Sequence, residues 1–85
     1  MDTTRDPEAF RALYREHHPT IRRYVAARAP ASQVDDLAAE TFLVAWRRAA
    51  DLPPHALPWL LNVAAKTLAN QRRAASARPP APRRP

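Results

Sequence analysis

This chain of 85 residues contains no glycine and no cysteine, and each absence excludes a class of structure. Without glycine, tight β-hairpin turns lose the residue that they favour, and the β-branched runs typical of strands are missing as well. Without cysteine, the chain can form neither a disulfide framework nor a thiolate metal site, which fits a reducing cytosol. No apolar run approaches the ~20 residues that a membrane-spanning helix needs, and the polar N-terminus does not resemble a secretory signal. We therefore expect one small all-α domain without membrane insertion.

Acidic residues are almost missing from the second half of the chain. Residues 1–40 hold six Arg against seven Asp or Glu, whereas residues 41–85 hold eight Lys or Arg and a single acid, Asp51. A basic excess confined to one half predicts a surface for a polyanion such as nucleic acid. From residue 78 onward the chain contains only Arg, Pro and Ala, a low-complexity composition that predicts a disordered cationic tail.

The first helix has a clear predicted start, because Asp6 is a good N-cap and Pro7 suits the first helical position. Its apolar stripe continues in phase across Pro19, so we expect one helix that is kinked near Pro19 and ends before Pro30. A clean break at Pro19 is the alternative. The stripe residues are Phe10, Leu13, Tyr14, His17, Ile21, Tyr24, Val25 and Arg28. We expect His17 to pack beside Tyr14 and Ile21.

Two further helices are predicted around a proline-rich loop at residues 51–57. Ser32 is expected to cap the second helix, with Asp35 in the position of a capping-box acid. The residues expected to be buried are Val34, Leu37, Ala38, Thr41, Phe42, Ala45 and Ala49 in the second helix, and Leu60, Val63, Ala64, Thr67 and Leu68 in the third, which is expected from Pro58 to about Ala75. Trp46 and Trp59 flank the loop, and packing is favoured for both over stacking against an unpaired base.

Asp36 and Glu40 lie four residues apart, so both carboxylates project from the same side of the second helix. They form either a docking patch for a basic partner helix or an ordinary solvated face, with Glu40 near Arg47 or Arg48. No catalytic motif is visible in the sequence. No metal site is expected at His17 and His18 either, because adjacent residues splay apart on a helix.

A second stripe occupies the third helix, where Asn62, Lys66, Asn70 and Arg73 follow at steps of four, four and three. Asn pairs with base edges, and Lys and Arg pair with phosphates, so an aligned set suits one nucleic-acid strand. The alternative is a plain solvent-exposed face.

The order and spacing of these residues resemble a known family. The segments that carry the resemblance are Phe10-x-x-Leu13-Tyr14-x-x-His17, Asp36-Leu37-x-x-Glu40-x-Phe42-x-x-Ala45-Trp46, Trp59-Leu60 and Leu68-Ala69-Asn70-Gln71-Arg72-Arg73. Over roughly residues 7–76 they resemble region 2, the promoter-melting domain, of bacterial extracytoplasmic-function sigma factors. The resemblance implies a cytoplasmic, nucleoid-associated transcription initiation factor that is not an enzyme and holds no cofactor or metal.

The resemblance also implies two binding surfaces. One binds the clamp helices of the largest catalytic subunit of RNA polymerase, and its residues here are Asp35, Asp36, Ala39, Glu40 and Leu43. Ala39 stands where the family commonly has Gln. The other holds the melted non-template strand of the minus-ten promoter element, and its residues here are Leu52, Pro54, His55, Asn62, Lys66, Asn70, Arg72 and Arg73. Residues 52–57 match the loop that holds an extruded base in this group, with Leu52 where an aromatic residue is common.

The expected division of the chain is a flexible segment at 1–5, a region 2-like domain at 6–76, and a Pro/Arg-rich linker or tail at 77–85. A complete sigma factor of this group has a second helical domain, so this chain is either a piece of such a factor or a stand-alone domain. Two other functions remain open. One is a module that binds polymerase or an anti-sigma protein without productive promoter recognition. The other is an unrelated basic helical DNA-binding module.

Overall fold

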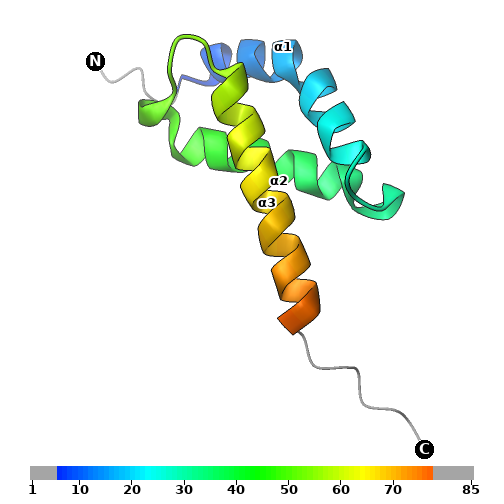
Figure 1. Ribbon diagram of the computed structural model, residues 1–85. Helices are drawn as coiled ribbons and strands as arrows, with labels where there is room; N and C mark the ends of the chain where they lie inside the picture. The colour runs from blue at the N-terminus through cyan, green and yellow to red at the C-terminus, as the bar shows by residue number, and fades with distance from the viewer. Residues whose placement is uncertain (1–5, 78–85) are drawn as a thin grey trace, which may run out of the picture.

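The computed structural model describes residues 6–77. This part of the chain forms three long helices, with one short 3₁₀ turn before the second helix and another after it (Figure 1). In chain order the elements are α1 (Pro7–Ala26), η1 (Ala31–Gln33), α2 (Val34–Arg47), η2 (Ala49–Asp51) and α3 (Leu57–Ala77). No strand occurs among these residues, and the all-α prediction is confirmed. The flexible N-terminus and the disordered tail expected from the sequence lie outside the described residues, and the expected domain boundaries stay a prediction.

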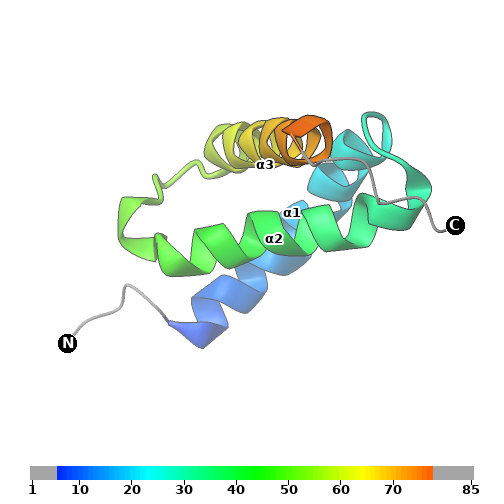
Figure 2. The same cartoon turned by 90° about the horizontal axis from the view of Figure 1, so that it is seen from below.

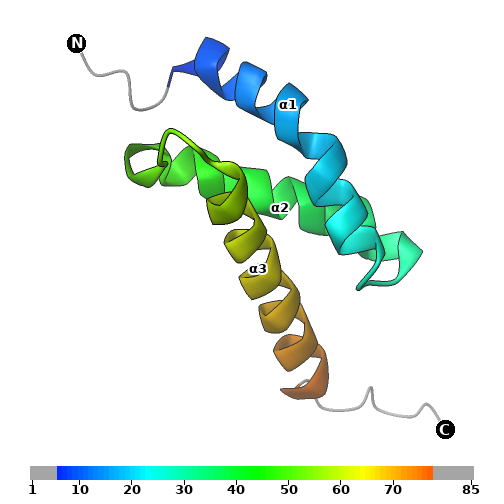
Figure 3. The ribbon, with the colours of Figure 1, turned by 45° about the horizontal axis from the view of Figure 1, so that its top comes forward.

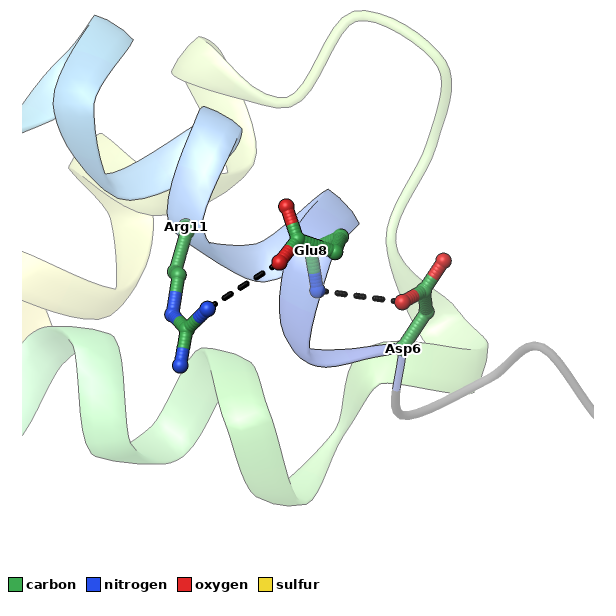
Figure 4. A network of polar contacts seen from close by, with 3 residues as sticks. All are labelled: Asp6, Glu8 and Arg11. Atoms are coloured by element: carbon green, nitrogen blue, oxygen red, sulfur yellow. Dashed lines mark hydrogen bonds and ion pairs between the residues drawn. The ribbon is translucent and has the colours of Figure 1, made fainter.

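The start of α1 agrees with the sequence prediction. A side-chain oxygen of Asp6 accepts a hydrogen bond from the backbone N–H of Glu8 at 3.0 Å, and Pro7 occupies the first helical position (Figure 4). Arg11 Nη1 in turn donates to Glu8 Oε1 at 3.0 Å. The cap satisfies one of the N–H groups that have no partner in the first turn of a helix.

Pro19 lies inside α1, which is one helix from Pro7 to Ala26, so the alternative of a clean break is wrong. Because proline has no N–H, α1 loses one internal hydrogen bond here, and the ribbon bends in this region (Figure 3). Ile21 and Val25, which follow the proline in the same phase, are fully buried.

Two details predicted for the start of α2 are wrong. Ser32 does not cap α2, because residues 31–33 form η1 and α2 begins at Val34 without a side-chain cap. Asp35 serves no capping box either, since its carboxylate accepts from Arg22 Nε at 3.0 Å.

In α1, the histidine ring that stacks on Tyr14 is that of His18, with the centroids 4.6 Å apart, because residues four apart stand one above the other on a helix.

The core lies where the three helices meet, with α2 packed against both α1 and α3. The buried apolar residues are Ile21, Val25, Val34, Leu37, Ala38, Phe42, Ala45, Ala56, Leu60, Ala64 and Leu68. Every α2 residue predicted to be buried is buried, and the hydroxyl of Thr41 donates to the Leu37 carbonyl at 2.9 Å. Three residues expected to be buried are half-buried instead. They are Ala49, which lies in η2, and Val63 and Thr67, which lie in α3.

Aromatic side chains fill the space between the N-terminal half of α1 and the C-terminal half of α2. Phe10 meets Trp46 edge to face with the centroids 5.3 Å apart, and Tyr14 contacts Phe42 at 4.8 Å. Trp46 is therefore a packing residue, as predicted.

Proline excludes helix from residues 52–56, and α3 begins one residue earlier than expected, at Leu57. In the part of the chain that the structure describes, no helix has the length and apolarity needed to span a membrane.

Candidate functional site

The first candidate surface is the exposed side of α2, which we call the outer face of α2. Its residues are Asp36, Ala39, Glu40 and Leu43. Asp36 and Glu40 are both exposed, and together with Thr67, Asn70 and other α3 residues they line a hollow of about 460 Å³ between α2 and α3. Within residues 6–77 neither carboxylate forms an ion pair or a side-chain hydrogen bond. Their charge is therefore available to a partner.

Arg48, which the sequence offered as a partner for Glu40, instead pairs with Asp51. Its Nε atom lies 3.2 Å from Asp51 Oδ2.

The other residues expected on this surface differ in their surroundings. Ala39 is exposed, and Leu43, with 41% of its surface exposed, is one of the two exposed large apolar residues of the described chain. Both lie on the side of α2 that carries Asp36, at helical spacings of three and seven. Asp35 differs because it forms the ion pair with Arg22 that ties α2 to α1. The outer face of α2 thus presents one exposed apolar side chain beside two unpartnered carboxylates.

The second candidate surface is a groove between the C-terminal half of α2 and the first turns of α3. Its volume is about 330 Å³, and we call it the α2–α3 groove. The groove is lined by Val44, Arg48, Trp59, Asn62, Val63, Lys66 and Asn70. Three members of the predicted α3 stripe therefore share one wall, and Arg48 contributes a second cation from the opposite helix. The guanidinium of Arg48 and the ammonium of Lys66 are both exposed, so each can reach a phosphate.

The two arginines near the end of α3 have different environments. Arg73 donates a hydrogen bond to the side-chain oxygen of Asn70, so it belongs to the stripe that borders the groove. Arg72 instead reaches the turn that follows α1, where its Nη2 atom donates to the carbonyl of Arg28 at 3.0 Å. The structure therefore does not bring Arg72 together with the other residues expected to bind DNA.

The loop residues are also divided. Pro54 and His55 are exposed, whereas Leu52 is half-buried and lines a different hollow of about 450 Å³ beside Phe10 and Trp46. Pro54 and His55 can therefore meet a partner directly. Leu52 faces the space between α1 and α2.

Two residues of the α2–α3 groove were not expected at the strand-binding surface. Arg48 was considered only as a partner for Glu40, and for Trp59 packing was favoured over stacking against a base. Trp59 precedes Asn62 by three positions, a helical spacing that could have placed its ring on the stripe. Its side chain is half-buried, so it packs against the core and also forms part of the groove wall. Nothing in the sequence indicated Arg48, because its place depends on how α2 packs against α3.

The described residues offer no group of three or more His, Cys, Asp or Glu side chains that could hold a metal ion. What the two surfaces can do is bind: one is acidic and partly apolar, and the other is basic and rich in amides.

Comparison with known proteins gives one finding. The family model for sigma-70 region 2 matches residues 13–78, which is well over half of the chain and includes α2, α3 and the loop between them. No curated protein and no solved structure gives a significant match. The family match leaves no place for the alternative of an unrelated DNA-binding module. The chain belongs to the sigma-70 region 2 family.

Proposed function

We propose that this domain binds core RNA polymerase through the outer face of α2 and holds the non-template strand of a melted minus-ten promoter element in the α2–α3 groove. Membership in the family provides the general function, because sigma-70 region 2 is a transcription initiation domain that binds core RNA polymerase and melts promoters. The observation that carries the finer proposal is the separation of charge along α2. Unpartnered acids lie in its N-terminal half, and the cation of the groove lies at its C-terminal end.

The outer face of α2 suits a basic helix as its partner. Asp36 and Glu40 offer two carboxylates on one side of the helix, and Leu43 adds an apolar contact beside them. Complementary charge speeds encounter and fixes the register of two helices, while the apolar contact adds affinity. The clamp helices of the polymerase are the partner that the family indicates, and an anti-sigma protein that covers the same face would compete with them.

The α2–α3 groove suits a single strand better than a duplex. Arg48 and Lys66 come from different helices and can neutralise phosphates on both sides of a narrow track. The amides of Asn62 and Asn70 can pair with base edges, which are accessible only when the strand is unpaired or the groove of a duplex is entered. The half-buried ring of Trp59 offers a platform on which one base can stack.

Energetics explain why the domain should work together with polymerase. Taking one base out of the stack costs a few kcal/mol, roughly. Stacking one base on an aromatic ring returns about 1–3 kcal/mol. Trp59 alone therefore offsets about one base, and the loop residues Pro54 and His55 are exposed and so accessible to a second. Melting several base pairs needs the additional binding energy of polymerase, so we place the domain in the cytoplasm at the nucleoid, where polymerase and chromosome meet.

Charge reversal on α2 tests the polymerase contact. The double variant Asp36→Lys with Glu40→Lys should abolish binding to core polymerase while the helical circular dichroism and the melting temperature stay nearly unchanged, because both side chains are exposed. Glu16→Lys is the matched control for Glu40→Lys, since Glu16 is an exposed helical glutamate on α1 and the charge change is equal. Wild-type affinity in the folded double variant would refute this contact.

The remaining alternative is an interaction module without productive promoter recognition. It predicts normal polymerase binding together with no preference among single-stranded sequences. A sequence preference that depends on the groove and the loop would exclude it.

A further inference from the structure

Two arginine side chains donate hydrogen bonds to backbone carbonyls in the last turn of α1 and just after it. Arg28 Nη1 donates to the carbonyl of Tyr24 at 2.9 Å, and its guanidinium carbon lies 3.8 Å from the centre of the Tyr24 ring. Arg72, which is 44 residues further along the chain, donates to the carbonyl of Arg28 at 3.0 Å. Tyr24 lies in the last turn of α1, where carbonyls lack intrahelical partners and carry partial negative charge, whereas the Arg28 carbonyl lies in the turn two residues beyond the helix.

The C-terminal part of α3 has little other attachment. Up to residue 75, where the description of side chains ends, Leu68 is the last buried residue of α3, and residues 69–75 are all exposed. In Figure 1 these last turns extend away from α2, and in Figure 2, which is seen from below, they come toward the viewer. Besides the Arg72 contact, the side chain of Gln71 donates to that of Gln33 over a longer distance of 3.4 Å. Arg72 therefore makes the shorter of the two polar contacts that hold this part of α3.

We propose that Arg72 is a positioning residue, which fastens the C-terminal part of α3 to the turn that follows α1 and so sets the place of Asn70 and Arg73, instead of contacting DNA itself. The DNA part of this inference rests on the proposed function of the α2–α3 groove. Arg73 and Asn70 are bonded to each other one turn from the anchor, so fraying of these turns would displace both. The family match alone does not distinguish Arg72 from Arg73, which are adjacent and identical in type.

Hydrogen exchange of the free chain tests the anchor without any DNA. Arg72→Ala should speed exchange of the amides in residues 69–77 by about two- to tenfold, the range expected for the loss of one hydrogen bond. Arg73→Ala is the matched control, because it removes the same charge from the next position and only a contact within α3, so it should speed this exchange less than Arg72→Ala does. Arg72→Lys keeps a cationic donor and should restore most of the protection.

Strand binding in the complex with core polymerase provides the second readout. Arg73→Ala should lower the log–log salt slope by about 0.7, the value for one phosphate contact on a single strand. Arg72→Ala should weaken strand binding at temperatures far below its melting point, because less of the free protein has this part of α3 in place. The slope should stay unchanged, because the bound strand selects the ordered helix in which Arg73 still contacts its phosphate, and Arg72→Lys should recover the affinity. A residue that only stabilised the fold would leave strand binding unchanged at these temperatures, whereas a phosphate contact would lower the slope.

Unchanged exchange in Arg72→Ala, or a salt slope lowered as in Arg73→Ala, would overturn the proposal and make Arg72 an ordinary surface cation or a phosphate contact. Separately, if Lys66→Ala leaves strand binding unchanged, the proposed function of the groove fails. The exchange measurement still decides whether Arg72 is an anchor, so the two failures are distinguishable.

Discussion

The ion pair between Arg48 and Asp51 should limit how strongly the α2–α3 groove binds a strand. Asp51 is the single acid in residues 41–85, and its carboxylate lies 3.2 Å from the Nε atom of Arg48, which lines the groove. A phosphate that approaches the groove must compete with this carboxylate for the same guanidinium. Asp51→Asn removes the charge and keeps an oxygen that can accept the hydrogen bond, so the local turn should persist.

The size of the effect follows from the exposure of the pair. The two side chains are 59% and 56% exposed, so the pair is worth about 0.2–1 kcal/mol, as is typical of exposed ion pairs. Asp51→Asn should therefore raise the affinity for a single strand by about 1.4- to 5-fold, with RT taken as ~0.59 kcal/mol. The gain should shrink as salt is added, because screening weakens exposed charges.

A double-mutant cycle in the complex with core polymerase provides the assay. Fluorescence anisotropy with a labelled single-stranded oligonucleotide would be measured for the wild type, Asp51→Asn, Arg48→Ala and the double variant. Arg48→Ala should lower the salt slope by about 0.7. If Asp51 acts through Arg48, Asp51→Asn should have almost no effect in the Arg48→Ala background. An equal gain in both backgrounds would refute the reasoning and leave only a general effect of net charge.

The other predictions concern the core and the stripe on α3. Phe42→Ala should lower the free energy of unfolding by about 3–5 kcal/mol in a denaturant titration, because the ring is buried against Phe10 and Tyr14. A loss below about 0.5 kcal/mol would show that the ring does not support the core. Lys66→Ala should weaken binding equally for all single-stranded sequences and lower the salt slope by about 0.7, whereas Asn62→Ala should change which base is preferred. A uniform loss for both variants in a binding titration would contradict the division of roles.

Much of the fold could be predicted from the sequence because each helix carries its own periodic stripe. The α2 stripe from Val34 to Ala45 and the cap at Asp6 depend on residues within one helix, and both are confirmed. The phase of Ile21 and Val25 across Pro19 predicted a continuous α1 for the same reason. The Ser32 cap was wrong because a 3₁₀ turn precedes α2, and the choice between two kinds of first turn has no strong signal in the sequence.

The candidate site was only partly predictable. The α3 stripe follows from helical spacing, so Asn62, Lys66 and Asn70 share one wall of the groove as the pattern indicates. The opposite wall could not be predicted, because the place of Arg48 depends on the packing of two helices. The contact of Arg72 with Arg28 joins residues 44 positions apart, and no local pattern distinguishes Arg72 from Arg73.

Selection from a randomised library of single-stranded oligonucleotides, with the domain bound to core polymerase, tests the central claim most directly. The account predicts that a short motif is enriched over the starting library, and that a matched duplex library gives weaker enrichment. Replacing the exposed loop residues Pro54 and His55 with alanine, or changing Asn62 to alanine, should alter the enriched motif while polymerase binding persists. Enrichment of no motif, with polymerase binding intact, would contradict the account.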